Sequence, residues 1–331
     1  PAWLAFFLVP FAPMARLEAQ LFTSVEVRMV AGPDYAFNSP MDVTNPLFDP
    51  ASGSLFYCGD GTDRVMKIAD PQAASPPEAT GIPTGGNQFC AIDAKAGHIL
   101  AVDQQSGLVT LTRASDLVRL AERQLDPLPE GEIFVTLDPR HDHLLLSSEV
   151  TRPAPARPAI RVLTASSLAP VVTFDERPGA QTIDPESGAI LFSSFRDRTG
   201  ISAYDPLTGA PLARAESDAR SDRLLVDEKR HRLIVTSPAA SRLRLYDLPG
   251  LQPAGVLHSM LGGRSLVLDP VRDLLLVASL SGKVQVIDLG SGQILRQYRV
   301  GPWLRDMVLD PEAGIAYVAS RFGIYRLNYL D

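Results

Sequence analysis

Residues 264–301 decide the fold of this chain: RSLVLDPVRDLLLVASLSGKVQVIDLGSGQILRQYRVG. The stretch contains four short apolar runs, at Ser265–Leu268, Leu274–Ala278, Lys283–Ile287 and Ile294–Val300. The breaks between the runs are rich in Asp, Pro, Gly and Ser, which supply turn dihedrals and local side-chain caps. Short β runs joined by tight turns predict a four-stranded antiparallel meander.

The same unit recurs along the chain, and each copy carries an aspartate at the end of its first apolar run. These landmark aspartates are Asp49, Asp93, Asp138, Asp184, Asp227, Asp269 and Asp310, separated by 44, 45, 46, 43, 42 and 41 residues. A period of this length is typical of β-propellers. We therefore predict an all-β, seven-bladed β-propeller of four-stranded antiparallel blades. An aspartate at a strand end accepts backbone N–H bonds from the following hairpin, so we expect the landmark aspartates to hold turns.

The last repeat is one strand short, because only residues 307–310, 315–319 and 323–327 form apolar runs before Asp331. Residues 24–30 (SVEVRMV), followed by Ala-Gly-Pro, are similar to residues 296–300 (RQYRV), followed by Gly-Pro. The latter is the fourth run of the preceding repeat. We therefore expect the N-terminal strand to complete the last blade and close the ring, which removes exposed sheet edges.

The order of these runs and turns resembles the YVTN-type and related surface-layer-like seven-bladed propellers over residues 24–331. The run that names that family has variants here at residues 276–279 (LVAS) and 316–320 (AYVAS). The Gly-His and Trp-Asp pairs of WD repeats do not recur. The resemblance implies an architecture only, because propellers serve as enzymes, receptors and scaffolds alike.

Residues 1–20 form an apolar N-terminal segment that precedes the predicted propeller of residues 21–331. Residues 1–15 (PAWLAFFLVPFAPMA) carry no charged side chain and two internal prolines. They are fewer than the roughly 20 residues that span a bilayer as a helix. We interpret them as the end of a membrane helix or of a signal-peptide apolar region, or as a strap packed on the propeller. The membrane interpretation predicts an anchored protein with its propeller on the periplasmic or extracellular face.

The chain has 331 residues and a formal net charge of −7, which argues against a nucleic-acid binder held by phosphate contacts. Its two cysteines, Cys58 and Cys90, are too few for a disulfide scaffold or a structural zinc site. They fall near the same end of neighbouring predicted blades. They form either a disulfide, which requires Cα atoms within about 7 Å, or two small buried hydrophobes.

In a propeller, the first strand of each blade lines the central channel. The loops before these strands share a face with the loops between the second and third strands. Polar residues five or six positions before the landmark aspartates predict a channel-mouth site on that face: Asn87, Gln88, Glu132, Asp222, Arg264 and Arg305. This site would take a small polar ligand or a partner's loop. Alternatively, the side chains satisfy one another and trapped water around a solvated channel.

The predicted loops between second and third strands on the same face are rich in basic residues. They carry Arg64, Arg152, Arg157, Arg196, Arg198, Arg242, Lys283 and Arg321. Because the whole chain is acidic, this asymmetry favours contact with an acidic protein surface or anionic lipid head groups, screened by salt.

The leading hypothesis is a non-catalytic interaction or assembly module with a membrane-embedded protein partner and a membrane contact through residues 1–15. No phosphate-binding loop, Gly-x-Ser-x-Gly elbow or His-Glu-x-x-His motif occurs. His141 and His143 have a chelating spacing without an evident third ligand, so we predict no metal and no cofactor. Two alternatives stay open: a lactonase-like hydrolase or a lyase that uses the channel mouth, and a small-ligand-binding protein.

Overall fold

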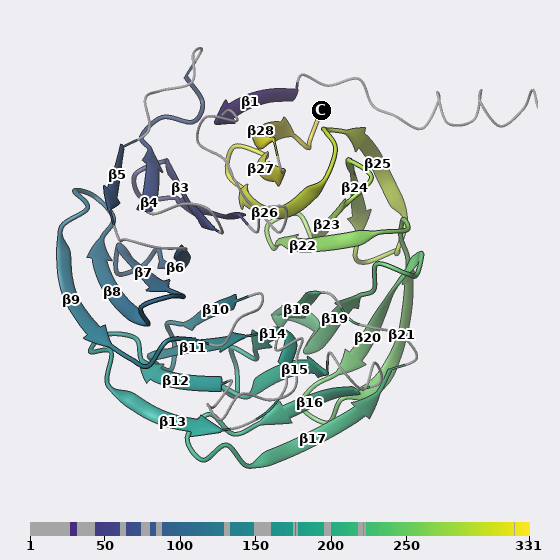
Figure 1. Cartoon of the computed structure of the whole chain (residues 1–331). Helices are drawn as coiled ribbons and strands as arrows, with labels where there is room; N and C mark the ends of the chain where they lie inside the picture. The colour runs from purple at the N-terminus through teal and green to yellow at the C-terminus, as the bar shows by residue number, and fades with distance from the viewer. Residues whose placement is uncertain are drawn as a thin grey trace, which may run out of the picture.

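The computed structural model describes residues 27–31, 44–59, 64–73, 80–83, 88–128, 133–148, 160–174, 176, 178–194, 200–217, 221, 223–320 and 322–331. These residues form seven four-stranded antiparallel sheets arranged in a ring, as Figure 1 shows in a view along the central axis. The predicted all-β, seven-bladed propeller is therefore confirmed. Residues 1–20 lie outside the described residues, so the proposed anchor stays a prediction.

Blades are numbered 1 to 7, starting with the blade that contains β2. The inner strands of the blades are β2 (Thr44–Asp49), β6 (Gln88–Asp93), β10 (Ile133–Asp138), β14 (Pro178–Ile183), β18 (Arg223–Asp227), β22 (Gly263–Asp269) and β26 (Leu304–Asp310). The second strands are β3 (Ser54–Gly59), β7 (His98–Asp103), β11 (His143–Ser148), β15 (Ile190–Ser194), β19 (Arg232–Thr236), β23 (Leu274–Ser279) and β27 (Ile315–Ser320).

The outer half of each blade is built in the same way. The third strands are β4 (Arg64–Ile68), β8 (Leu108–Arg113), β12 (Ile160–Thr164), β16 (Gly200–Tyr204), β20 (Arg242–Asp247), β24 (Lys283–Asp288) and β28 (Gly323–Asn328). The fourth strands of blades 1 to 6 are β5 (Thr80–Pro83), β9 (Arg119–Gln124), β13 (Pro170–Phe174), β17 (Pro211–Glu216), β21 (Gln252–His258) and β25 (Ile294–Arg299). Among the described residues, the 3₁₀ helix η2 (Glu228–Arg230) follows β18.

The strand β1 (Val27–Ala31) pairs antiparallel with β28 and takes the outer position in blade 7 (Figure 1). That this strand closes the ring stays a prediction. A separate contact joins the two ends of the ring, because blade 1 packs directly on blade 7. The rings of Phe48 and Tyr317 stack there with their centroids 5.7 Å apart, inside a cluster of buried apolar side chains from both blades.

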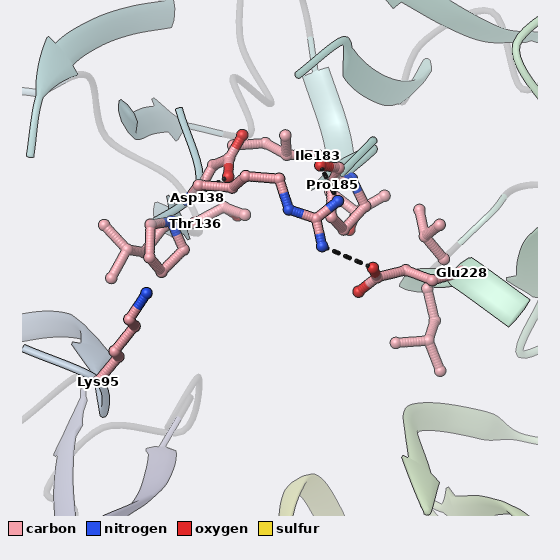
Figure 2. A pocket seen from close by; sticks show the side chains of 12 residues that line it. Lys95, Thr136, Asp138, Ile183, Pro185 and Glu228 are labelled. Atoms are coloured by element: carbon pink, nitrogen blue, oxygen red, sulfur yellow. Dashed lines mark hydrogen bonds and ion pairs between the residues drawn. The ribbon is translucent and has the colours of Figure 1, made fainter. Parts of the chain in front are cut away.

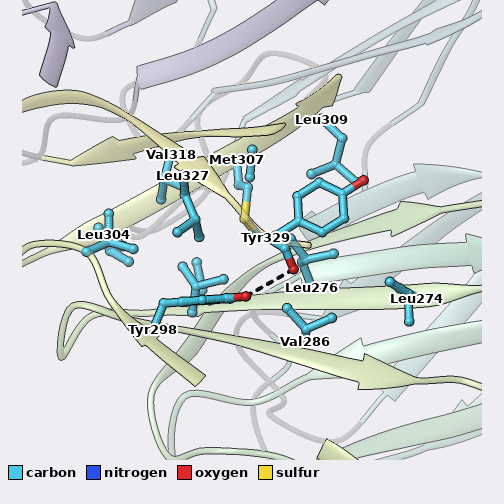
Figure 3. Close-up of a cluster of buried hydrophobic side chains, with 14 residues drawn as sticks. Leu274, Leu276, Val286, Tyr298, Leu304, Met307, Leu309, Val318, Leu327 and Tyr329 are labelled. Atoms are coloured by element: carbon cyan, nitrogen blue, oxygen red, sulfur yellow. Dashed lines mark hydrogen bonds between the residues drawn. The ribbon is translucent and has the colours of Figure 1, made fainter. Parts of the chain in front are cut away.

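The core lies between the blades, with one cluster of buried apolar side chains at each of the seven contacts. Successive side chains of a strand point to opposite faces of the sheet, so a strand covered on both faces is apolar throughout. All six residues of β23 are buried in this way. Figure 3 shows the cluster between blades 6 and 7, where the Tyr298 hydroxyl donates to the Tyr329 carbonyl oxygen at 3.1 Å.

The landmark aspartates hold the hairpins between first and second strands, as predicted. Six of the seven accept a backbone N–H two or three residues later; Ala51 N, for example, donates to Asp49 Oδ1 at 3.1 Å. Asp227 differs because η2 follows it, and its carboxylate accepts from Arg230 Nη1 at 3.0 Å. We call the face that carries these hairpins the lower face and the opposite one the upper face.

Candidate functional site

The predicted channel-mouth residues are only partly described by the structure. Arg264 and Arg305 lie at the upper ends of β22 and β26, and Gln88 begins β6. The remaining three, Asn87, Glu132 and Asp222, lie outside the described residues. Whether the six residues form one binding or catalytic site stays a prediction.

Two β-bulges place Arg264 and Arg305 in equivalent positions of neighbouring blades. The register of β22 against β23 shifts between Gly263 and Ser265, and that of β26 against β27 shifts between Leu304 and Asp306. A bulge inserts an extra residue into one strand of a ladder and re-aims its side chain. Both arginines are the residues inside these shifts, and both are half-buried.

Polar contacts close to these arginines join inner strands across the upper end of the ring. Ser265 Oγ donates to Asp306 Oδ1 at 2.9 Å, which links blades 6 and 7. The guanidinium carbon of Arg223 lies 5.6 Å from the centroid of the Phe134 ring, a cation–π distance. Because Arg223 belongs to blade 5 and Phe134 to blade 3, this contact joins blades that are not neighbours.

Backbone hydrogen bonds link the upper loops of blades 5, 6 and 7 in series. Gly262 N donates to Pro238 O at 3.0 Å, Leu280 N donates to Gly262 O at 3.1 Å, and Trp303 N donates to Leu280 O at 3.1 Å. The Pro238 and Leu280 loops follow the second strands of blades 5 and 6, whereas Gly262 and Trp303 precede inner strands. Each loop therefore holds the next one in place.

The series continues into the last loop of blade 7. Ser320 Oγ donates to Pro302 O at 2.7 Å and accepts from Phe322 N at 3.2 Å. Three large apolar side chains stand out on these linked loops, with exposed fractions of 60% for Leu261, 46% for Trp303 and 43% for Phe322. We call Leu261, Trp303 and Phe322 the upper ridge.

Basic side chains lie on the same face as the upper ridge. Of the eight predicted loop residues, Arg242 begins β20 and is exposed, and Lys283 begins β24 and is half-buried. The backbone of Arg64 begins β4. The other five, Arg152, Arg157, Arg196, Arg198 and Arg321, lie outside the described residues, so the full basic face stays a prediction.

Two adjoining cavities open on the lower face, at the opposite end of the inner strands from Arg264 and Arg305. The first, of about 610 Å³, is lined by Lys95 in the hairpin of blade 2, by the inner strands of blades 3 to 5 and by the hairpins that follow these strands (Figure 2). The second, of about 470 Å³, is lined by blades 5 to 7 and shares Leu225, Val226 and Glu228 with the first. Sequence reasoning placed the ligand site at the other end and missed both.

Ion pairs connect the hairpins of the lower face from blade to blade. Arg140 Nη2 lies 3.0 Å from Glu228 Oε2, and the guanidinium of Arg230 donates two hydrogen bonds to Asp273, at 2.7 and 2.6 Å. Lys229 Nζ is 2.8 Å from the same carboxylate. Hydrogen bonds from Arg230 and Lys229 hold the pKa of Asp273 well below its usual range.

Cys58 and Cys90 are joined in a disulfide that ties β3 of blade 1 to β6 of blade 2. Their Cα atoms are 6.2 Å apart, a distance common among disulfides. Both residues are also buried in the apolar cluster between these blades. The bridge is therefore a covalent link inside an interface that packing already forms.

Metal ligation finds no support within the described part of the chain. No group of three or more His, Cys, Asp or Glu side chains gathers there in a way that could hold an ion. His141, one of the two histidines with chelating spacing, has its Nδ1 2.6 Å from Asp138 Oδ2. The described residues also include no helix long and apolar enough to cross a membrane.

No protein-family model matches the chain, and no curated protein matches it in sequence. The YVTN or surface-layer repeat type therefore stays a resemblance. The seven-bladed β-propeller fold is established by the structure itself.

Proposed function

We propose that the chain is a non-catalytic interaction module whose upper face, over blades 5 to 7, binds a protein partner. The upper ridge is the observation that carries this proposal. Its apolar side chains are exposed on loops that hydrogen bonds hold in one arrangement. A preorganised surface loses less conformational entropy on binding, and tryptophan is enriched among the residues that dominate interface energetics.

The backbone of Trp303 supports a binding role for its side chain. Trp303 has a φ of 59°, in the left-handed region that favours glycine. The equivalent loop position of blade 6 is Gly262, with a φ of 79°. Leu168 and Leu251 share the positive φ but are 1% exposed, so their burial offsets the backbone cost, whereas nearly half of Trp303 faces solvent.

The partner should present apolar side chains next to acidic ones. Arg264 and Arg305 lie at the adjoining upper ends of the inner strands, and Arg242 and Lys283 begin third strands on the same face. Complementary charge at the rim of an interface mainly sets partner choice and the rate of association. We extend this to the predicted arginines of the undescribed loops.

We further propose that the partner is membrane-embedded, that residues 1–15 contact the membrane, and that the propeller lies on the periplasmic or extracellular face. The apolar sequence of residues 1–15 supports the membrane contact. The Cys58–Cys90 disulfide supports the periplasmic or extracellular location, because disulfides persist in oxidising environments and are rare in the cytosol.

Charge introduced into the upper ridge tests the proposal. Leu261→Glu places a carboxylate where an acidic, apolar partner would bind, and Leu261 is 60% exposed, so the fold should tolerate the change. The matched control is Val271→Glu on the lower face, where Val271 is 72% exposed. After cross-linking in cells, both variants and the wild type would be purified separately from the membrane and soluble fractions, and the partners quantified by mass spectrometry.

The expected result is a partner recovered with the wild type and with Val271→Glu but reduced at least fivefold with Leu261→Glu. Circular dichroism and thermal melting would establish that both variants are folded. Equal recovery from Leu261→Glu and Val271→Glu would refute binding at the upper ridge. Recovery from a soluble fraction alone would refute the membrane-embedded partner while leaving the ridge itself supported.

A further inference from the structure

The two lower-face cavities form a site of their own, on the opposite face from the upper ridge. Their walls are apolar side chains of the inner strands, among them Leu137, Ile183, Leu225 and Val226. The first cavity alone, at about 610 Å³, falls in the range of roughly 300–1,000 Å³ typical of small-molecule sites. A hollow with apolar walls and a few polar groups at its rim is the usual form of such a site.

The charged groups at the rim differ in whether they are already engaged. Arg140 donates to Pro185 O at 2.6 Å and pairs with Glu228 at 3.0 Å. Asp138 is engaged within its own turn, because Oδ1 accepts from Arg140 N at 3.0 Å and Oδ2 lies 2.6 Å from His141 Nδ1.

Lys95 is the exception among the described residues that line the first cavity, because its ammonium has no hydrogen-bond or ion-pair partner there. Figure 2 shows Lys95 and Glu228 on opposite sides of the cavity, with the side chain of Lys95 directed toward it. The site therefore offers one free positive charge at one wall, whereas the carboxylate at the far wall is already paired with Arg140.

The second cavity extends the apolar surface beyond Glu228. Val267, Leu268, Val308 and Leu309 line it, and it adjoins the first cavity at Leu225. A ligand anchored at Lys95 thus has apolar inner-strand side chains beside it from blade 3 to blade 7. This shape fits an elongated body better than a compact one.

From this arrangement we propose that the lower-face cavities bind an organic monocarboxylate with an extended apolar body. The carboxylate pairs with the Lys95 ammonium, and the body lies against the inner-strand side chains of blades 3 to 7. Burial of the body contributes most of the affinity, since the favourable free energy of burial grows with the apolar area removed from water. The ion pair selects the charged end group and sets the orientation. This binding is separate from partner binding on the upper face.

Isothermal titration calorimetry of the full chain with sodium decanoate, below its micelle concentration, tests the proposal. Sodium acetate and decan-1-ol serve as comparison probes, the first without the apolar body and the second without the charge. We expect saturable binding of one decanoate per chain, no measurable binding of acetate, and weaker binding of decan-1-ol.

Two variants locate the site. Lys95→Gln should weaken decanoate binding about three- to tenfold, as expected for a partly exposed ion pair, and leave decan-1-ol binding unchanged. Lys283→Gln on the upper face is the matched control and should bind decanoate like the wild type. Thr182→Trp should fill the first cavity, which Thr182 lines, and abolish binding, with circular dichroism establishing the fold.

No binding of decanoate at millimolar concentration would overturn the proposal. So would an equal loss in Lys95→Gln and Lys283→Gln, or unchanged binding in Thr182→Trp. Failure of this proposal is distinguishable from failure of the interaction proposal, because Leu261→Glu alters the upper face and should leave decanoate binding intact.

Discussion

Replacing Asp273 with asparagine should expose the contribution of the ion pairs between blades 5 and 6. Asp273 lies in the hairpin between β22 and β23 and accepts from Arg230 and Lys229 of blade 5. Its φ is 60°, a left-handed conformation that asparagine adopts more readily than most residues. Asp273→Asn therefore removes the charge while retaining the shape and the backbone conformation.

The partial burial of the Arg230–Asp273 ion pair sets the size of the expected stability loss. The side chains of Arg230 and Asp273 are 22% and 27% exposed, so this ion pair is intermediate between an exposed and a buried one. An exposed pair contributes about 0.2–1 kcal/mol to stability, whereas breaking a buried pair costs about 3–5 kcal/mol. Arg230 keeps its contact with Asp227 at 3.0 Å, so it is not left without a counter-ion. We expect Asp273→Asn to lower the free energy of unfolding by about 2 kcal/mol at pH 7.

The effect should depend on pH in a defined direction. Because hydrogen bonds from Arg230 and Lys229 lower the folded-state pKa of Asp273 below the unfolded value of about 3.9, its stabilisation is present above the unfolded pKa. It is lost as the pH falls below that value toward the folded one. The difference in unfolding free energy between wild type and Asp273→Asn should stay constant from about pH 8 to pH 5 and shrink below about pH 4.

Urea titrations followed by circular dichroism at pH 7, 5, 4 and 3 would measure this difference. The matched control is Asp116→Asn, since Asp116 pairs with Arg113 at 2.7 Å while both side chains are nearly half exposed. The control should change stability less than Asp273→Asn at pH 7. Equal effects of the two substitutions, or a difference for Asp273→Asn that persists undiminished at pH 3, would refute the reasoning.

Two further predictions concern the connections that hold neighbouring segments together. Replacing Cys58 and Cys90 together with alanine opens a loop with a sequence separation of 32 residues and should lower the unfolding free energy by about 3–4 kcal/mol; wild type under reducing conditions should show a similar loss in urea titrations. Gly282→Ala should destabilise the chain by about 2 kcal/mol more than Gly97→Ala. Both glycines have positive φ, but a Cβ at Gly282 collides with the carbonyl oxygen of Gly301, whereas one at Gly97 meets open space. Equal thermal midpoints for the two glycine variants would contradict this.

The fold could be predicted from the sequence because its determinants are local and repeat. Six of the seven landmark aspartates cap a hairpin within three residues of themselves, so the turn chemistry is visible wherever the repeat is visible. The contacts between blades, in contrast, could not be predicted from the repeat. Arg230 and Asp273 are 43 residues apart, and the period alone does not tell which side chain of a hairpin reaches the next blade.

The end of the ring that holds the cavities also escaped prediction. Thr136 and Thr182 line the first cavity and stand two residues before their landmark aspartates. The other blades have Leu47, Ala91, Leu225, Val267 and Val308 at this position, so residue size in the aligned repeats does not mark the lower end. The cavities depend on how these side chains pack across the ring, between residues more than 40 positions apart in the sequence.

The two faces of the ring are stabilised differently, and this difference argues for their separate roles. Six of the seven lower hairpins are capped by their own aspartate, and side-chain contacts such as Arg140–Glu228 and Arg230–Asp273 link hairpins of different blades. The upper loops of blades 5 to 7 instead depend on one another through the bonds from Gly262 to Trp303. A surface built from interdependent loops keeps its shape as a unit, which suits recognition of a protein partner. Self-capped hairpins around a hollow with apolar walls suit a small ligand, because the walls come from the inner strands and the rim supplies charged groups such as Lys95.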